Sequence, residues 1–293
     1  MKVALFGRNG QLGSSLLAIL GDSMEVRAYG RNEVDLADGT RLRETLLRQE
    51  PRIIINAAAY TAVDRAESDA DTARRVNGEA PAVMARVAGE IGALLIHYST
   101  DYVFDGTAHE PYTEDSPTAP LGVYGKTKLA GEEAIRAAAG AYLIVRTCWL
   151  YSNHGRNFLK TMLRLADERD ELRVVNDQIG SPTYARLVAE ASVQMLSAMS
   201  DGQGFRTERS GVYHMACQGS VSWHGFAQRI IDLSGRAARV RVTPISTAQY
   251  PTPARRPAYS VLSCDKLERG FGIRLPEWGA ALRQCLADDH GLA

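Results

Sequence analysis

The sequence predicts an α/β fold, a Rossmann-type doubly wound parallel sheet joined to a smaller, interleaved C-terminal domain. Short apolar segments alternate with amphipathic helical segments over the first half of the chain. The apolar segments lack the polar–apolar alternation of a half-exposed strand, which is typical of parallel strands buried on both faces. This alternation ends near Tyr151, and that change predicts the second domain.

The elements of the first half follow the order expected of βαβ units. Leu12, Leu16 and Leu20 return to one face of the first predicted helix. Pro51 interrupts the chain before the third strand, because proline cannot continue a helical hydrogen-bond ladder. Strands are expected at 2–7, 25–30, 52–59, 93–100 and 142–148, and helices at 12–20, 41–49, 72–91 and 126–139.

Polar loops and isolated elements follow Tyr151. We expect a helix at 186–199, a surface loop at 201–211 and one more core strand at 211–216, before a tail at 250–257 that is rich in Pro and Arg. The predicted division therefore places 1–150 and about 186–217 in the sheet domain. The smaller domain takes about 151–185 and 218–293.

Composition excludes several classes of protein. A chain of 293 residues suits one large domain and a smaller one. Lys plus Arg equals Asp plus Glu, at 34 each, so we expect neither nucleic acid nor a membrane as a partner. No apolar run could span a bilayer and no signal-peptide pattern follows Met1.

Cysteine and histidine positions indicate no metal site. The four cysteines lack C-x-x-C spacing and are expected to be buried thiols in a cytoplasmic protein. His97 lies inside an apolar strand and is expected to be a satisfied core residue, and the other histidines are scattered. The residues concerned are Cys148, Cys217, Cys264, Cys285, His97, His154, His214 and His224.

The segment GRNGQLG places Gly7, Gly10 and Gly13 between the first strand and the first helix. Glycine permits the tight turn and lets the backbone approach a pyrophosphate, which then lies at the helix N-terminus. Three glycines in a turn are weak evidence alone, but their position between a strand and a helix favours a dinucleotide site. The sheet domain is therefore predicted to bind a dinucleotide.

The end of the second strand indicates which dinucleotide is bound. An acidic residue there favours NAD, whereas a basic residue accommodates the additional phosphate of NADP. No carboxylate occupies 28–30, and Arg31 follows at once, with Arg8 in the glycine turn. We therefore expect NADPH, with NADH possible because Glu33 is close by.

The segment VYGKTKLAGEEA places Tyr124 and Lys128 four residues apart, on one face of a helix. A lysine ammonium near a phenol favours the phenolate and would lower the tyrosine pKa. A tyrosine so tuned can give a proton to a carbonyl oxygen while a nicotinamide supplies hydride. The pairing is common by chance, but Ser99, Thr100 and Asp101 end the fourth strand, at the sheet edge where such folds bind ligands.

These motifs resemble those of the extended short-chain dehydrogenase/reductases, and within them the dTDP-4-dehydrorhamnose reductase family. The resemblance covers nearly the whole chain. The segments that carry it are GRNGQLG, NAAAYTAVDRAE, HYSTDYVFDG, VYGKTKLAGE, RTCWLY, NDQIGSPT and YPTPARRP. The family implies a cytoplasmic NAD(P)H-dependent reductase of the 4-keto group of dTDP-4-dehydro-6-deoxy-L-mannose, with the smaller domain binding the nucleotide sugar.

The resemblance also implies roles for individual residues. Catalysis would rest on Tyr124 as proton donor, Lys128 as a ribose ligand and tuning cation, and Thr100. Substrate would meet Thr100, Asp101 and Trp149, with Asn157, Arg255 and Arg256 at the diphosphate. The cofactor would be bound by Gly7, Gly10, Gln11, Leu12, Gly13, Arg31, Asp35, Leu36, Ala59, Tyr60, Thr61, Tyr98, Tyr124 and Lys128.

Three alternatives stay open at this point. Another nucleotide-sugar 4-ketoreductase would share these motifs. A dehydratase or epimerase would have the same fold, but a dehydratase of this class carries a glutamate after the aspartate, where this chain has Tyr102. A non-catalytic regulatory subunit resembling that of methionine adenosyltransferase would bind a partner, although Thr100, Tyr124 and Lys128 argue for an enzyme.

One feature departs from the family pattern. Some members are described as using acidic residues on the first helix for a magnesium-bridged dimer. This chain has Ser14, Ser15 and Leu16 there, with no carboxylate. We therefore expect a monomer or weak homodimer, and no metal.

Overall fold

Six parallel strands form the central sheet, in the order β10-β5-β4-β3-β1-β2. The computed structural model describes residues 1–21, 23–138, 140–200, 202 and 204–288, so residue 139 of the expected helix and residues 201 and 203 of the expected loop lie outside the described residues. The strands are β1 (Lys2–Phe6), β2 (Glu25–Tyr29), β3 (Ile53–Asn56), β4 (Leu94–Thr100), β5 (Tyr142–Thr147) and β10 (Gly211–His214). Successive strands are added toward one edge of the sheet from β1 to β2 and toward the other edge from β3 onward, so the predicted doubly wound sheet is confirmed.

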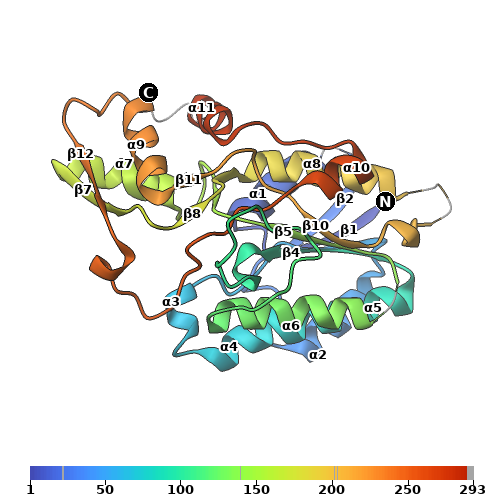
Figure 1. Cartoon of the computed structure of the whole chain (residues 1–293). Coiled ribbons are helices and arrows are strands. Elements are labelled where there is room, and N and C mark those ends of the chain that lie inside the picture. The colour runs from blue at the N-terminus through green and yellow to red at the C-terminus, as the bar shows by residue number, and fades with distance from the viewer. Residues whose placement is uncertain (22, 139, 201, 203, 289–293) are drawn as a thin grey trace.

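Helices cover both faces of this sheet (Figure 1). Alternate residues of β1 belong to different core clusters: Val3 packs with Leu16 and Met195, and Ala4 packs with Leu46 and others. A strand buried on both faces is what its continuous apolar sequence predicts. The first face carries α1 (Gln11–Leu20) and α8 (Ala185–Met199), and the second carries α2 (Gly39–Gln49), α5 (Ala80–Ile91) and α6 (Val123–Ala137).

The helix expected at 72–91 is divided in the structure. It consists of α4 (Ala70–Arg74), a π-helical turn η1 (Arg75–Glu79) and α5, preceded by the short α3 (Val63–Ala66). Asn77, in the π-helical turn, bonds Tyr60 and Thr127 through its side chain. Insertions of this type recur at functional sites, and this one brings Asn77 against α6.

Helix α6 begins at Val123, three residues before the expected start. Gly122 is the extended N-cap residue, so the helix starts directly after it and includes Tyr124. The outcome places Tyr124 in the first helical turn and Lys128 one turn later. Gly125 permits this packing, because a Cβ there would collide with the carbonyl oxygen of Tyr102.

The second half of the chain builds a lobe beside the carboxyl edge of the sheet, and α8 returns from it to the sheet (Figure 1). Strands β7 and β12 pair in parallel, whereas β8 and β11 pair antiparallel. Sequence analysis did not predict the helices of this lobe, and the domain bounds stay a prediction. The lobe contains β6 (Leu150–Tyr151), α7 (Phe158–Glu168), β7 (Glu171–Val175), β8 (Ile179–Gly180), β9 (Thr183–Tyr184), β11 (Val221–Ser222), α9 (Trp223–Leu233), β12 (Arg241–Ile245) and α11 (Trp278–Asp288). Helix α10 (Asp265–Phe271) instead packs on α8 and β10 of the sheet.

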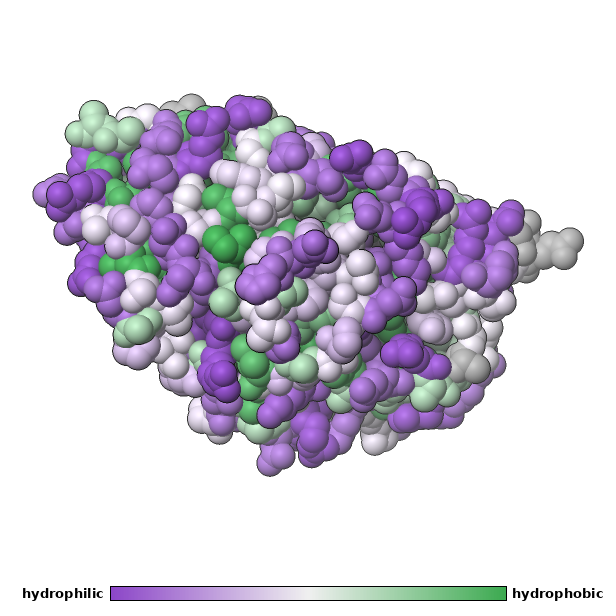
Figure 2. All heavy atoms as spheres, viewed as in Figure 1, coloured by the Kyte–Doolittle hydropathy of each residue, from purple (hydrophilic) through white to green (hydrophobic). Residues whose placement is uncertain are grey.

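Hydrophobic residues on the face seen in Figure 2 form small areas separated by hydrophilic ones. Within the described part of the chain, no helix is both long and apolar enough to cross a membrane. The four cysteines are buried, as expected.

Candidate active site

The glycine turn lies at the carboxyl end of β1, beside the point where the chain direction reverses. Gly7 has a φ of +94°, and a Cβ there would lie 2.7 Å from the backbone nitrogen of Ala58. A Cβ on Gly13 would collide with the carbonyl oxygen of Gly7. Gly10 is the N-cap of α1, and this helix end has neither a side-chain cap nor an acidic residue in its first turn. The turn therefore leaves backbone N–H groups for an anion, as its sequence predicts.

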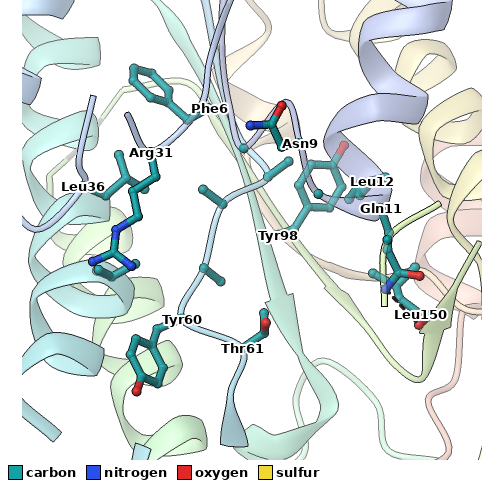
Figure 3. A pocket seen from close by; sticks show the side chains of 18 of the residues that line it. Phe6, Asn9, Gln11, Leu12, Arg31, Leu36, Tyr60, Thr61, Tyr98 and Leu150 are labelled. Carbon is teal, nitrogen blue, oxygen red and sulfur yellow. Dashed lines mark hydrogen bonds between the residues drawn. The ribbon is translucent and has the colours of Figure 1, made fainter. Parts of the chain in front are cut away.

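A cavity of about 520 Å³ opens at this turn and extends to α6 (Figure 3). Of the predicted cofactor residues only Gly13, which packs under the turn, is not among those that line it. Ser99, expected at this edge of the sheet, lines it too, as do Asn9 and Arg156, which sequence analysis did not identify as site residues. The predicted residues along its wall are Gly7, Gly10, Gln11, Leu12, Arg31, Asp35, Leu36, Ala59, Tyr60, Thr61, Tyr98, Tyr124 and Lys128.

The two arginines expected near the adenosine ribose differ in their partners. Arg31 lines the cavity, is largely exposed and lies 3.5 Å from the Asp35 carboxylate. Arg8 is paired instead with Glu33, at 2.5 Å. Glu33 also accepts the Gly30 N–H at 2.7 Å, so its carboxylate lies at the end of β2. Arg31 is therefore the arginine available to a 2′-phosphate.

Tyr60 is fixed by contacts from the π-helical turn. Its N–H donates to Asn77 Oδ1 at 2.8 Å, and Asn77 Nδ2 donates back to the Tyr60 carbonyl at 3.1 Å. The Tyr60 hydroxyl donates to Asp69 at 2.9 Å. Asn77 also donates to Thr127 of α6. This one side chain therefore ties the cavity wall to the helix that carries Tyr124, a link that no sequence motif indicated.

Burial favours the protonated form of Tyr124. Burial raises its pKa to about 12, opposed by a hydrogen bond with Thr100 and reinforced by Asp101. The expectation that Lys128 brings this pKa near working pH is therefore wrong. The Lys128 side chain is directed to β4, where Nζ lies 2.6 Å from the Tyr98 carbonyl oxygen and 3.1 Å from His97 Nε2. A protonated phenol is the form that can donate to a carbonyl oxygen.

Thr100 and Asp101 follow β4 as expected and lie beneath Tyr124. Thr100 Oγ1 donates to Asp101 Oδ1 at 3.0 Å and accepts the Tyr102 N–H at 3.2 Å. Both side chains are buried, and burial raises the pKa of Asp101 to about 6. The Tyr102 ring meets the Tyr124 ring edge-on with centroids 5.6 Å apart. Tyr102 is therefore a further residue of this site.

A buried ion pair supports the same end of the sheet. Arg146 of β5 binds Glu132 of α6 through two nitrogens, the shorter contact being 2.6 Å. Glu132 also accepts from Ser99 at 2.5 Å. Removing one partner would leave an uncompensated buried charge, so the pair fixes α6 against β4 and β5. Glu132 lies one turn beyond Lys128.

Trp149 has a strained backbone, with a φ of +45°. Its ring stacks on Trp223 of α9, with centroids 3.4 Å apart and planes 4° from parallel. A Cβ at Gly180 would lie 2.5 Å from the same ring, so glycine is required there. The predicted substrate residue is thus held between the two halves of the chain.

The three residues predicted for a diphosphate have different environments. Asn157 caps α7, accepting from the Lys160 N–H at 3.0 Å, and donates to Gln11 of α1 at 2.9 Å. Its side chain is therefore fully engaged inside the protein. Arg255 is exposed and lines neither the cofactor cavity nor the second cavity, in the smaller lobe, that Arg256 lines.

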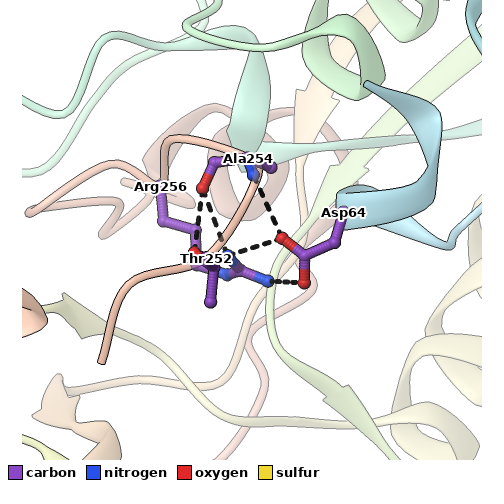
Figure 4. Close-up of polar contacts among 4 residues, drawn as sticks. All are labelled: Asp64, Thr252, Ala254 and Arg256. Carbon is purple, nitrogen blue, oxygen red and sulfur yellow. Dashed lines mark hydrogen bonds and ion pairs between the residues drawn. The ribbon is translucent and has the colours of Figure 1, made fainter. Parts of the chain in front are cut away.

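Arg256 lies in a network that joins the tail to α3 (Figure 4). Asp64 accepts from Arg256 at 2.7 Å and from the Ala254 N–H at 3.2 Å, and Thr252 accepts from Arg256. The Arg256 guanidinium holds the pKa of Asp64 below its usual value. Arg256 also lines a second cavity of about 410 Å³ in the smaller lobe.

This second cavity has aromatic and cationic walls. Phe158 and Trp223 line it, as do Arg169, Arg173 and Tyr250. Tyr250 is more than half exposed, at 60%. Across the described residues, no group of three or more His, Cys, Asp or Glu side chains is placed to hold a metal ion.

A dinucleotide-type glycine turn and a tyrosine–lysine pair on one cavity of a doubly wound sheet define an extended short-chain dehydrogenase/reductase. More narrowly, the chain belongs to the RmlD substrate binding domain family, whose model matches residues 1–290.

Three similar proteins place the chain within this family. A dTDP-4-dehydrorhamnose reductase from Burkholderia thailandensis is 46% identical, over 98% of this chain and 99% of its own. Among solved structures, a dTDP-4-dehydrorhamnose reductase from Clostridium acetobutylicum is 38% identical, with a TM-score of 0.91 over 98% of this chain and 99% of its own. The enzyme of that name from Bacillus anthracis, solved in complex with NADP, is 35% identical with the same TM-score and the same coverage of both chains.

Proposed function

We propose that this chain catalyses the NADPH-dependent reduction of the 4-keto group of dTDP-4-dehydro-6-deoxy-L-mannose, which gives dTDP-L-rhamnose. The observation that carries the proposal is that Tyr124 and Lys128 line the same cavity as the glycine turn. When bound, NADPH supplies the hydride that reaches the carbonyl carbon. Similarity to several dTDP-4-dehydrorhamnose reductases supports the choice of substrate.

The residues present fit a dinucleotide. The backbone at Gly7 and Gly13 leaves no room for a Cβ, and the uncapped end of α1 presents its N–H groups to a pyrophosphate. We assign Gly7, Gly10, Gln11, Leu12 and Gly13 to that end. Asp35 and Leu36 take the adenine side, and Arg31 takes the 2′-phosphate. Ala59, Tyr60, Thr61 and Tyr98 line the nicotinamide side.

The proton for the reduced oxygen comes from Tyr124. Its raised pKa keeps the phenol protonated at neutral pH, and Thr100 holds the hydroxyl in place. Transfer of this proton to the carbonyl oxygen neutralises the charge that develops when hydride adds to the carbon. Lys128, one turn away on α6, also lines the cavity and holds the cofactor ribose.

The nucleotide sugar would lie between this site and the second cavity. Trp149 and Asp101 would contact the sugar beside Tyr124, and Arg256 would bind the diphosphate, because a guanidinium binds phosphate oxygens through two N–H groups. The aromatic wall of the second cavity offers Phe158 and Trp223 to a base. Asn157 and Arg255 are weaker candidates, given their positions.

Turnover of the purified chain with NADPH and the dTDP-linked 4-keto sugar tests the proposal. The absorbance of NADPH should fall with the sugar present, and NMR of the product should show the rhamno configuration at C4. A product with the other C4 configuration would assign another 4-ketoreductase. Absence of turnover despite cofactor binding would favour the non-catalytic regulatory subunit, and loss of water from a dTDP-hexose would favour a dehydratase.

We propose that the enzyme is a cytoplasmic monomer or weak homodimer. Its burial of all four cysteines suits a reducing compartment. Helix α1 has no acidic residue in its first turn, so it lacks the carboxylates that a magnesium-bridged dimer would use there. Light scattering after gel filtration, at several protein concentrations, measures the assembly.

A further inference from the structure

A buried chain of polar groups leads from the cofactor cavity to Lys128. The Ala58 N–H donates to Asn56 Oδ1 at 3.2 Å, and Asn56 Nδ2 lies 3.0 Å from His97 Nδ1. On the other side of the ring, His97 Nε2 lies 3.1 Å from Lys128 Nζ. The side chains of Asn56, His97 and Lys128 are at most 1% exposed, so their polar atoms must find hydrogen-bond partners within the protein.

The direction of each hydrogen bond follows from the groups at the start of the chain. The Ala58 N–H can only donate, so the oxygen of the Asn56 amide must face it. The Asn56 NH₂ group then faces His97 and can only donate, so Nδ1 must be the acceptor. Burial holds the pKa of His97 well below its usual value, and a neutral ring carries a single proton. That proton therefore lies on Nε2 and faces Lys128.

A neutral amine fits this arrangement and an ammonium does not. An amine accepts the His97 Nε2–H through its lone pair and donates to the Tyr98 carbonyl oxygen, 2.6 Å away. An ammonium has no lone pair, so one N–H would face another. Burial also lowers the pKa of Lys128 to about 8, and Glu132 opposes this.

The ionisable groups near Lys128 do not strongly favour either its amine or its ammonium form. Glu132 favours the ammonium but is itself neutralised by Arg146 of β5. His97 on β4 and Glu132 on α6 act on Lys128 directly, and Arg146 on β5 acts through Glu132. Tyr124 lies one turn earlier on α6, and the charge that acts on it is that of Asp101, after β4.

We propose that Asn56 and His97 are positioning residues for the reaction proposed above: Asn56 fixes the His97 proton on Nε2, and that N–H disfavours the charged form of Lys128. The lysine is thereby a group that changes charge near working pH rather than a permanent cation. The Ala58 N–H is the first donor in this series of hydrogen bonds, and Ala58 lines the cofactor cavity. The hydrogen bonds therefore link the wall of that cavity to the charge of Lys128.

The tautomer of His97 tests the first half of the proposal without any need for activity. Two-dimensional ¹H–¹⁵N NMR of the histidine rings separates Nδ1–H from Nε2–H, and the signals of His97 are assigned from their loss in His97→Gln. At about pH 9, where Lys128 is an amine, His97 should carry its proton on Nε2. A proton on Nδ1 at that pH overturns the proposal.

The charge of Lys128 tests the second half. The chain has five lysines, Lys2, Lys126, Lys128, Lys160 and Lys266, so the ε-carbon NMR signal of Lys128 can be assigned and titrated. In Asn56→Asp a carboxylate accepts from His97, which moves its proton to Nδ1 and lets Nε2 accept from the ammonium. The titration midpoint of Lys128 should rise by roughly one pH unit or more. An unchanged midpoint overturns the proposal.

A second pair of variants distinguishes the effect of the His97 tautomer from the direct electrostatic effect of the carboxylate introduced at position 56. In His97→Gln, the substitution Asn56→Asp should move the Lys128 midpoint much less, because the ring that transmits the change is gone. An equal shift in both backgrounds would mean simple charge–charge attraction and would overturn the role of His97. If the doubly substituted protein does not fold, the tautomer of His97 in the wild-type protein still tests the proposal. Lack of turnover would refute the proposed function alone, since neither NMR readout requires catalysis.

Discussion

Tyr124 and Lys128 lie one helical turn apart on α6, yet their polar ends have different partners. The hydroxyl of Tyr124 bonds Thr100, whereas Lys128 Nζ bonds the Tyr98 carbonyl oxygen and faces His97. The two residues therefore contribute separately: one holds the proton that is donated, and the other sets the charge beside it.

Tyr124→Phe should lower kcat by about 10² to 10⁴, because general acid catalysis is typically worth that factor. Cofactor affinity, measured by NADPH fluorescence, should change little, and circular dichroism should show an intact fold. Thr100→Val should also lower kcat, since it removes the hydroxyl that positions the phenol. A Tyr124→Phe enzyme that turns over at the wild-type rate would remove Tyr124 from the mechanism.

Lys128→Met should lower both kcat and the affinity for NADPH, because it removes the titratable amino group and a proposed ribose ligand while keeping a long apolar stem. Lys126→Met is the matched control: it lies two residues away on the same helix but is exposed. Steady-state kinetics and cofactor titration of both variants provide the measurement. Equal effects in the two variants would argue against a specific role for Lys128.

The kcat/KM ratio for NADPH over NADH should exceed one in the wild-type enzyme and should narrow in Arg31→Ala. Arg31 lines the cavity and is exposed, so a 2′-phosphate can reach it. Arg27→Ala, an exposed change on β2 outside the cavity, serves as the control. A wild-type enzyme that prefers NADH severalfold would contradict this assignment and would point to Glu33 at the end of β2.

Asp101→Asn should stabilise the fold at neutral pH. Burial raises the pKa of Asp101 from 3.8 to about 6, so the folded chain binds this proton more tightly than the unfolded chain. Ionisation therefore lowers the free energy of unfolding as pH rises from about 4 to above 6. The asparagine removes a cost of at most about 3 kcal/mol at pH 7.5, and little near pH 4. Urea unfolding at both pH values measures the difference, and an equal gain at both would contradict the burial argument.

Treatment with a chelator should leave both kcat and the oligomeric state unchanged. The described residues offer no cluster of metal ligands, and α1 begins without a carboxylate. The measurement is NADPH oxidation and light scattering before and after dialysis against EDTA. Activity that disappears with EDTA and returns with added magnesium would show that the enzyme requires a metal ion.

The motifs of the first half could be read from sequence because their signals are local. The glycine turn depends on residues next to one another, and the strands of the sheet depend on short apolar runs. Helices α7 and α9 were missed, although each carries an apolar face, because the loops around them interrupt the alternation that organised the first half. The π-helical turn at Asn77 was missed because its partners, Tyr60 and Thr127, come from other segments.

The sequence by itself determined the alternation of strands and helices in the first half of the chain, the glycine turn, and the spacing of Tyr124 and Lys128, because each depends on a few neighbouring residues. Only the tertiary structure decided what those groups contact. Arg256 binds Asp64 across 192 residues, and Lys128 faces His97 across 31. Burial then set the ionisation of Tyr124, Asp101 and Lys128, because the free energy of a charge depends on the water and partners around it, which the fold alone supplies.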